Sequence, residues 1–355
     1  MNARMAALRD ALRKANCDAF FSFSPPANHY LSGFRGTASS LLITLDEAYF
    51  LCDFRYMEQA REQVRDYEIL EVVGALETRT GERLRALEVE QAGFDPASLS
   101  VQQHKMVQEA FDGTLIPLEH LPGALREIKD ASEIARMRAA CALTEQALMN
   151  VLETVRPGVS EAAVAARLEY EFRRLGADGA AFPVIVLFGA RSSLPHGMPG
   201  KTTLSEGDIV LVDCGCILEG YCADLTRTFV SGRIMGDWFT EIYQAVLQAQ
   251  QAGLAALRAG VTARDVDAAA RRIINDAGYG AHFGHGLGHG VGLEVHETPR
   301  LNMQSEAVLQ AGMAVTVEPG IYLPGRGGVR IEDLTVVTET GCEVLTGLPK
   351  ELQVI

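Results

Sequence analysis

The chain has little of the basic charge and none of the long apolar segments that nucleic-acid-binding and membrane-spanning proteins use. Its 355 residues include 32 lysines and arginines against 46 aspartates and glutamates, a formal net charge of −14. Phosphate groups are bound by basic surfaces, so this balance argues against nucleic acid as a partner. The longest apolar run, residues 209–218, is interrupted by Asp213 and falls well short of the roughly 20 residues of a membrane helix. We therefore expect neither nucleic acid nor a membrane as partner.

The cysteines lack the spacing of a redox or zinc motif. There are seven, an odd number, and no two form a C-x-x-C pair. Cys214 and Cys216 lie in an apolar strand pattern, which favours buried thiols over ligands or nucleophiles. Arg4, Arg9 and Arg13 interrupt the N-terminus, so no signal peptide is expected. A reduced, cytoplasmic protein is the simplest interpretation.

Motifs of three other enzyme classes are also absent. His296-Glu297 is followed by Arg300 where the H-E-x-x-H zinc motif has its second histidine. The segment Gly200-Lys201-Thr202 resembles the end of a phosphate loop, but Pro195 occupies the position of the first glycine. The glycines of residues 284–292 are out of register with G-x-G-x-x-G. These mismatches argue against a zincin, a P-loop enzyme and a dinucleotide-binding fold.

The length predicts two domains, since one domain typically spans roughly 100 to 200 residues. Helical and strand-like patterns alternate in residues 1–127, which predicts an α/β domain. Strands are expected at residues 19–23, 41–45 and 49–51. A polar joint then precedes a long helix, for which Asp130 and Glu133 form a plausible capping box. We place the boundary near residue 127 and a second domain at residues 128–355.

The second domain contains an internal repeat. The segment Arg156-Pro-Gly-Val-Ser160 recurs 102 residues later as Arg258-Ala-Gly-Val-Thr262. Each copy is expected to begin a helix capped by Ser or Thr and closed by Gly176 or Gly278. The repeat predicts two similar halves, a pseudo-two-fold relation and a cleft between them. Chance similarity of two amphipathic helices is the alternative.

Two pairs of acidic residues interrupt apolar strand patterns. A hairpin turning at Leu218-Glu219 would place Asp213 directly opposite Asp224, with Cβ atoms about 4.5–5.5 Å apart. Carboxylates that close repel each other unless a proton or a cation lies between them. An ion pair with Arg227 is the alternative, but it would neutralise only one of the two.

Glu318 and Glu332 form the second pair, joined by a glycine-rich turn at residues 324–328. A bulge at Pro319-Gly320 would let both glutamates face one point. A solvent-exposed position is the alternative for either glutamate alone. It is weaker for both, because strand-forming apolar residues flank each of them.

Histidines gather in the glycine-rich segment between these hairpins. His282, His285, His289 and His296 are four of the eight histidines and fall within 15 residues. This clustering favours a functional role over buried structural histidines. The alternating glycines would let the backbone approach a ligand closely.

Four carboxylates and one imidazole make an oxygen-rich site that suits two divalent ions. Mn²⁺ fits such a ligand set best, with Co²⁺ or Zn²⁺ as alternatives. Two ions that share a water can make a hydroxide near neutral pH and polarise a carbonyl. The ligand set therefore predicts hydrolysis.

With these residues assembled, the sequence resembles the pita-bread metallopeptidases, and among them the Xaa-Pro peptidases prolidase and aminopeptidase P. The motifs that carry the resemblance are Asn28-His-Tyr-Leu-Ser-Gly-Phe34, Asp53-Phe-Arg-Tyr56, Pro195-His-Gly197, Val212-Asp213, Gly220-Tyr-Cys-Ala-Asp224-Leu-Thr-Arg-Thr228, Gly288-His289, Val295-His296-Glu297, Val317-Glu318-Pro-Gly320 and Val329-Arg330-Ile-Glu332-Asp333. The resemblance implies an α/β creatinase-like N-terminal domain and an α+β pita-bread catalytic domain with internal pseudo-two-fold symmetry.

The resemblance also implies roles for individual residues. The implied ligands of a dinuclear metal centre, two of them bridging, are Asp213, Asp224, His289, Glu318 and Glu332. Glu318 would also be the general base. His196 and His296 would hydrogen-bond the substrate carbonyl and the tetrahedral intermediate, and His285 would lie near the proline.

Two arginines complete the implied site. Arg330 matches a residue that supports the ligands, with an ion pair to Asp333 as the alternative. Arg300 matches an arginine that pairs with the free carboxylate of a dipeptide, with an exposed surface arginine as the alternative.

The resulting hypothesis is an Xaa-Pro dipeptidase that acts on Xaa-Pro dipeptides or short peptides, as a homodimer. An aminopeptidase P that acts on longer peptides is the main alternative. Methionine aminopeptidase is disfavoured by the N-terminal domain and Arg300, and a creatinase-like enzyme by the full ligand set. A non-catalytic protein of the same fold should have lost ligands, and all five are present.

Overall fold

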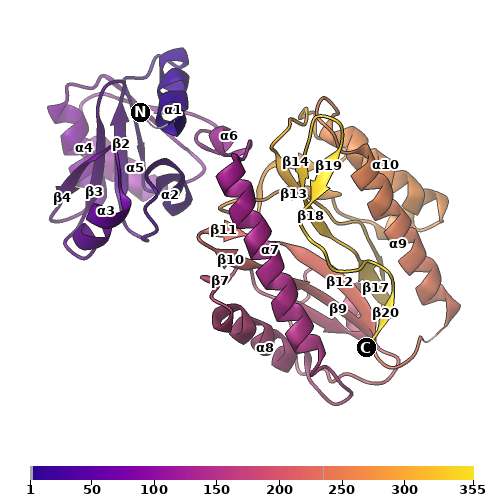
Figure 1. Ribbon diagram of the computed structural model, residues 1–355. Helices are drawn as coiled ribbons and strands as arrows, with labels where there is room; N and C mark the ends of the chain where they lie inside the picture. The colour runs from indigo at the N-terminus through magenta and orange to yellow at the C-terminus, as the bar shows by residue number, and fades with distance from the viewer. Residues whose placement is uncertain (1–2, 235) are drawn as a thin grey trace. The chain divides into compact units, whose positions relative to one another are not determined.

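The computed structural model describes residues 3–234 and 236–355 and divides them into two units, one ending at Arg126 and the other spanning Glu127–Ile355 (Figure 1). Unit 1 contains the helices α1 Ala3–Lys14, α2 Pro25–Ser32, α3 Met57–Gln63, α4 Leu76–Ala86, α5 Val101–Ala110 and α6 Gly123–Arg126. Its strands are β1 Ala19–Ser22, β2 Ser40–Thr44, β3 Ala48–Cys52, β4 Glu68–Glu71, β5 Gln91–Phe94 and β6 Thr114–Pro117. The three strands expected from the sequence are therefore present.

The strands of unit 1 form one mixed sheet in the order β4-β3-β2-β1-β5-β6. β2 is antiparallel to β1 and β3, whereas β4, β5 and β6 join by parallel pairing. Phe21, Leu42 and Leu51 of the sheet pack with Leu84 and Val107 of α4 and α5 in one apolar core. Unit 1 is an α/β domain with helices packed on its sheet, as the alternating pattern predicts.

Among the described residues, unit 2 contains four long helices and four sheets. Its helices are α7 Ala131–Leu152, α8 Glu161–Arg174, α9 Asp237–Ala256 and α10 Ala263–Asp276, with 3₁₀ turns η1 Gly189–Ser193 and η2 Gly280–His282. The first-half strands are β7 Gly179–Ala180, β8 Ile185–Phe188, β9 Ile209–Cys214, β10 Cys216–Leu218, β11 Tyr221–Cys222 and β12 Leu225–Val230. The remaining strands are β13 Gly288–Gly290, β14 Glu297–Leu301, β15 Ala314–Val317, β16 Gly320–Leu323, β17 Gly327–Arg330, β18 Asp333–Val337, β19 Cys342–Val344 and β20 Gln353–Val354. The strand orders of the four sheets are β11-β10-β7, β20-β12-β9-β8, β14-β13-β15-β18-β19 and β16-β17.

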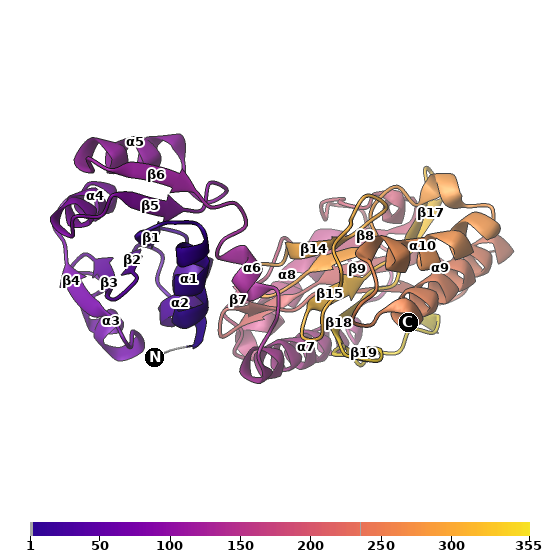
Figure 2. The same ribbon diagram turned by 90° about the horizontal axis from the view of Figure 1, so that it is seen from above.

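These elements repeat in the two halves of unit 2. Ser160 caps α8 and Thr262 caps α10, each accepting a hydrogen bond from a main-chain amide three residues on. Gly176 and Gly278 follow the two helices in left-handed conformations, with φ of 100° and 84°. The strands lie between α7 with α8 and α9 with α10, and α9 and α10 stay side by side in both views (Figure 1, Figure 2). The repeat is thus structural, and chance similarity of two helices is wrong.

The start of α7 also follows from the sequence. The Asp130 carboxylate accepts hydrogen bonds from the amides of Ser132 and Glu133, and the Glu133 carboxylate accepts one from the amide of Asp130. This capping box satisfies amides that the first helical turn leaves unpaired. Within the described part of the chain, no helix has the length and apolarity needed to cross a bilayer.

The hairpin that carries the aspartates has a different register from the predicted one. Asp213 lies opposite Thr226, not opposite Asp224, because the turn falls at Glu219-Gly220 instead of Leu218-Glu219. Both turn residues have positive φ, 49° and 84°, as a two-residue hairpin turn requires. The predicted direct pairing is therefore wrong. Residues two apart on one strand share a face, so both aspartates still point the same way.

The second hairpin keeps one register throughout. Val317 of β15 lies opposite Asp333 of β18, and Gly320 of β16 lies opposite Arg330 of β17. In both pairs the residue numbers add to the same value, so no residue is inserted at Pro319-Gly320 and the predicted bulge is wrong. The shared register places Glu318 directly across from Glu332, between the two strand pairs.

Candidate metal centre

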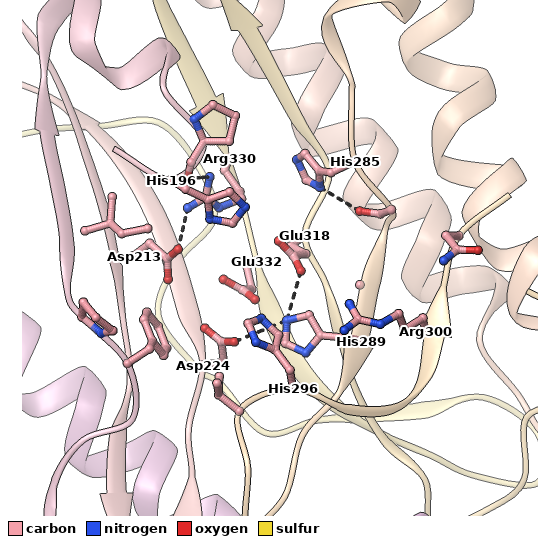
Figure 3. Close-up of a pocket in the computed structure, with 18 of the residues that line it drawn as sticks. His196, Asp213, Asp224, His285, His289, His296, Arg300, Glu318, Arg330 and Glu332 are labelled. Carbon is pink, nitrogen blue, oxygen red and sulfur yellow. Dashed lines mark hydrogen bonds and ion pairs between the residues drawn. The ribbon is translucent and has the colours of Figure 1, made fainter. Parts of the chain in front are cut away.

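A pocket of about 400 Å³ opens in unit 2 between the two strand hairpins. It is lined by every site residue predicted from the sequence: His196, Asp213, Asp224, His285, His289, His296, Arg300, Glu318, Arg330 and Glu332. Figure 3 shows their side chains converging from both halves of the unit. Residues separated by up to 136 positions therefore form one site.

Five of these side chains supply acidic or imidazole ligand atoms at the centre of the pocket. Ligand atoms of Asp224, His289 and Glu332 all lie within 4.8 Å of one another, which is close enough to share one ion. His289 Nε2 is 3.3 Å from Glu318 Oε1 and 3.7 Å from Asp224 Oδ2. Asp213 lies beside them on β9 (Figure 3).

The acidic residues of the pocket are buried and lie close enough to repel one another. Burial and the charges of Glu332, Asp213 and Glu318 hold the pKa of Asp224 well above its usual range. Burial and the charges of Glu318 and Asp213 do the same to the pKa of Glu332. Carboxylates in this arrangement must take up protons or a cation to avoid repulsion.

Glu318 and His289 behave differently because they contact each other. Burial acts to raise the pKa of Glu318, but the hydrogen bond to His289 and the charges of His289, His285 and Arg330 together lower it. Burial acts to lower the pKa of His289, but the contact with Glu318 raises it overall. Glu318 therefore stays ionised beside neighbours that tend to hold protons.

The ligand set fits divalent metal ions. Asp213 Oδ1 is buried and has no hydrogen-bond partner among the described residues, so it is available to a cation. The other groups are carboxylates and one imidazole, which divalent ions such as Mn²⁺, Co²⁺ and Zn²⁺ accept. No cysteine is found among the described residues that line the pocket.

Arg330 joins the two hairpins behind the ligands. Its Nη2 donates to Asp213 Oδ2 at 2.5 Å, its Nε to Thr226 Oγ1 at 3.0 Å and its Nη1 to the Tyr322 hydroxyl at 2.9 Å. The alternative partner, Asp333, instead accepts from Arg227 at 2.8 Å. Arg330 thus binds Asp213 and not Asp333, and among the described residues the recorded contacts of Arg227 include neither Asp213 nor Asp224.

Three further histidines face the pocket. His285 Nε2 lies 3.0 Å from the Tyr322 hydroxyl, and burial lowers the His285 pKa. The His296 ring lies 4.4 Å from the His289 ring between centroids; burial and the charges of His289 and Arg300 lower the His296 pKa. His196 is exposed at the pocket rim. The lowered pKa values keep His285 and His296 neutral near pH 7. Each imidazole ring therefore has one nitrogen that donates and one that accepts a hydrogen bond.

The fourth clustered histidine lies outside the pocket, whereas two of the clustered glycines line it. His282 ends η2 and is not among the residues that line the pocket. A side chain at Gly288 would collide with the Thr316 carbonyl, and one at Gly290 with the Thr298 carbonyl. Gly288 and Gly290 therefore allow close packing of neighbouring strands, while Gly286 and Gly288 also line the pocket.

Sequence reasoning missed three hydroxyl groups. Thr226 Oγ1 donates to Glu332 Oε2 at 2.6 Å, and Thr316 Oγ1 lies 3.3 Å from Glu318 Oε1. The Tyr322 hydroxyl connects Arg330 with His285. Each threonine is two residues from a predicted ligand, Asp224 or Glu318, and this period-2 spacing on one strand face is the signal that would have found them.

Fold and pocket together define a metal-dependent hydrolase, and comparison with known proteins gives its family. Residues 135–339 match metallopeptidase family M24, and residues 4–128 match the Creatinase/Prolidase N-terminal domain. The chain belongs to metallopeptidase family M24. Unit 1 accordingly has the creatinase-type α/β fold and unit 2 the pita-bread fold.

The chain is similar to several known proteins over nearly its whole length. The structure resembles an Xaa-Pro dipeptidase from Bacillus anthracis, with a TM-score of 0.96 and 42% identity over 99% of both chains. It also resembles an X-Pro aminopeptidase from Thermotoga maritima, with a TM-score of 0.91 and 36% identity over 98% of this chain and 100% of the other. An Xaa-Pro dipeptidase from Pyrococcus horikoshii is 34% identical over 99% of both chains.

Proposed function

We infer that this protein is an Xaa-Pro dipeptidase that hydrolyses the bond between an N-terminal residue and proline with the help of two divalent metal ions. The observation that carries this function is the convergence of the five ligand-type side chains, Asp213, Asp224, His289, Glu318 and Glu332, in one buried pocket. The dipeptidases from Bacillus anthracis and Pyrococcus horikoshii support the substrate class.

The five residues would hold the two ions, most suitably Mn²⁺, with Co²⁺ and Zn²⁺ as alternatives. Bound ions would supply a Lewis acid for the scissile carbonyl and lower the pKa of a water molecule. Glu318 keeps its charge because of His289, so it can accept a proton from that water and pass it to the leaving proline nitrogen. This is the role of general base that the resemblance implies.

His196 and His296 would donate hydrogen bonds to the carbonyl oxygen as negative charge develops on it. A neutral imidazole is a suitable donor, and the lowered pKa of His296 keeps it neutral. His285 is held by Tyr322 on the side of the pocket that would receive the proline ring. Arg330 would keep Asp213 in place by its hydrogen bond.

Arg300 is the residue that we propose distinguishes the dipeptide from a longer substrate. It lines the pocket from β14, where it lies opposite His289. A guanidinium there can pair with the free carboxylate of an Xaa-Pro dipeptide, which a longer peptide lacks at that position. The likeness to the Thermotoga maritima aminopeptidase is the observation that favours the second candidate, an aminopeptidase P.

The proposal also covers the division into domains, the oligomeric state, the cellular location and the partners of the protein. Residues 1–127 form the creatinase-type domain, and residues 128–355 carry the catalysis. The protein works as a homodimer in the cytoplasm, with no nucleic acid or membrane as partner. Its acidic net charge and its free cysteines support this setting.

Hydrolysis of an Xaa-Pro dipeptide and of an Xaa-Pro-Xaa tripeptide, with Mn²⁺ added, tests the proposal. We expect the dipeptide to be cleaved and the tripeptide to be spared. Arg300→Gln should then raise KM for the dipeptide without a matching loss for tripeptides. Preference for the tripeptide would make the protein an aminopeptidase P, and no cleavage of either would refute proline-specific hydrolysis.

A further inference from the structure

Two of the pocket histidines lie in segments without regular structure, yet both face the same small volume. His196 lies in residues 194–200, which form no helix or strand, and His285 lies between η2 and β13. An unsupported loop would spread each imidazole over many positions, because a flexible backbone has many accessible conformations. Something outside the loops must therefore fix them.

A buried carboxylate holds the His196 segment from both ends. Glu161, the first residue of α8, is fully buried, and its Oε1 accepts a hydrogen bond from the Phe188 amide at 2.9 Å. Its Oε2 accepts one from the Gly200 amide at 2.8 Å. The side chain thus ties the residue before η1 to the residue that closes the loop, with His196 between them.

Arg191 completes this arrangement. Its Nε lies 3.0 and 3.1 Å from the two Glu161 oxygens, and its Nη2 donates to the Met198 carbonyl at 2.7 Å. The guanidinium therefore neutralises the buried carboxylate and also holds the main chain two residues after His196. Arg330 adds a longer contact of 3.4 Å to the Pro195 carbonyl.

The second half of the unit contains the same device around His285. Asp267 of α10 is fully buried, accepts from the Leu287 amide at 3.0 Å and is bound by two nitrogens of Arg271 at 2.8 and 2.9 Å. Arg271 in turn donates to the Phe283 carbonyl at 3.0 Å and to the His285 carbonyl at 2.7 Å. The main chain is thus held on both sides of this histidine.

The structure assigns Glu161 with Arg191, and Asp267 with Arg271, as two positioning pairs that act on catalysis through His196 and His285. The pairs are not copies of each other in sequence, because the repeat aligns Glu161 with Ala263. The two carboxylates lie at different positions of the equivalent helices α8 and α10. Each nevertheless holds the main chain near one pocket histidine. Their effect on turnover rests on the proposed function, whereas their effect on the imidazoles does not.

Double-mutant cycles test the assignment. Glu161→Gln should lower kcat/KM for an Xaa-Pro dipeptide by about tenfold or more, since a misplacement near 1 Å can cost up to about 100-fold. The same change should have almost no further effect when His196 is already alanine, and its full effect when His285 is alanine. Asp267→Asn should show the opposite pattern.

Glu171→Gln is the matched control. Glu171 lies on the same helix α8, is buried, and is bound by Arg174 and Asn150 away from the pocket. It should lower stability without coupling to either histidine. Arg191 is about one third exposed, so Arg191→Gln offers a milder variant that carries the same cycle if Glu161→Gln does not fold.

Imidazole proton resonances of the metal-free protein give a second measurement that needs no activity. Glu161→Gln or Arg191→Gln should shift or broaden the His196 signal and leave that of His285 unchanged, and Asp267→Asn the reverse. Effects that are additive in both histidine backgrounds, or unchanged signals, would overturn the assignment. A wild-type protein inactive on Xaa-Pro peptides would refute the proposed function, while the resonances would still decide the positioning roles.

Discussion

The two hairpins that bring acidic residues to the pocket place them in different ways. In the β9–β12 hairpin, Asp213 lies opposite Thr226, so Asp224 is its diagonal neighbour two residues away. In the second hairpin, Glu318 and Glu332 lie directly across from each other. Both arrangements aim the carboxylates at one point. A site of this kind therefore depends on which strand face a residue occupies more than on exact cross-strand pairing.

The hairpins also support each other. Thr226 of the aspartate hairpin donates to Glu332 of the glutamate hairpin, and Arg330 of the glutamate hairpin donates to Asp213. These two contacts run in opposite directions between the strand pairs. Each hairpin thus orients a carboxylate that belongs to the other, and substitutions can remove these contacts one at a time.

Removing one ligand from each hairpin should have the largest effect. Asp224→Asn and Glu332→Gln should each lower kcat/KM by about 1,000-fold or more, because metal ions supply several kcal/mol of transition-state stabilisation. Steady-state assays with an Xaa-Pro dipeptide and saturating Mn²⁺ measure this. Glu343→Gln, an exposed glutamate on β19, is the control. Retained activity in Asp224→Asn would contradict the ligand assignment.

Breaking the contact between the hairpins should have a smaller effect. Arg330→Met leaves Asp213 without its hydrogen bond and should cost about 10- to 100-fold in activity and in metal affinity. Arg326→Met, at the turn of the same hairpin and outside the pocket, should change neither. Metal titrations of both variants provide the measurement, and equal affinities would rule out a supporting role for Arg330.

Asp224 and Glu332 should each make the metal-free protein less stable as the pH rises. The pKa values of Asp224 and Glu332 are raised by burial and by neighbouring charges, so their contribution is fully present below about pH 4 and is lost as the pH rises through the folded-state values. Glu318 has a lowered pKa and acts in the opposite sense, losing its contribution as the pH falls. Bound Mn²⁺ should remove most of the loss at higher pH.

Urea unfolding of the metal-free protein between pH 5 and 8 measures this slope. Asp224→Asn and Glu332→Gln should each flatten it, because neither amide titrates, whereas Glu318→Gln should not. A slope in Asp224→Asn and Glu332→Gln equal to that of the metal-free wild type would contradict the described charge arrangement.

Substitutions of the two threonines should cause the smallest losses of kcat/KM, and the loss should be larger for Thr226 than for Thr316. Thr226→Val removes a 2.6 Å hydrogen bond to Glu332 and should lower kcat/KM by about tenfold, the range for a bond to a charged group. Thr316→Val removes a 3.3 Å contact to Glu318 and should cost less. Measurements of kcat/KM for both variants under the same conditions would show this difference. A larger loss in Thr316→Val would mean that the distances do not report the strength of these contacts.

Sequence patterns singled out the four carboxylates that line the pocket but not how the strands align. A carboxylate inside an apolar strand needs a partner, and this alone singled out Asp213, Asp224, Glu318 and Glu332. The register depended on whether Leu218 or Gly220 belongs to the turn, and only the left-handed conformations of Glu219 and Gly220 decide that. The period-2 pattern survives a two-residue error in pairing, which is why the site was predicted and its register was not.

The contacts of the positioning pairs could not be predicted from the sequence. Glu161 contacts Phe188 and Gly200, which are 27 and 39 residues away, through main-chain amides that carry no side-chain signature. The repeat predicted the helix that Glu161 begins, but not the loop that its carboxylate would hold. Contacts of this kind depend on how segments that are distant in the sequence pack together, and local sequence patterns do not encode that packing.

The central claim is that both hairpins together hold one two-metal centre. Anomalous diffraction from crystals loaded with Mn²⁺ tests it most directly. The account predicts two peaks in the pocket, in contact with Asp213 and Asp224 from one hairpin and with Glu318 and Glu332 from the other, and the loss of at least one peak in Asp224→Asn. A single peak bound by only one hairpin, or density confined to another part of the protein, would contradict it.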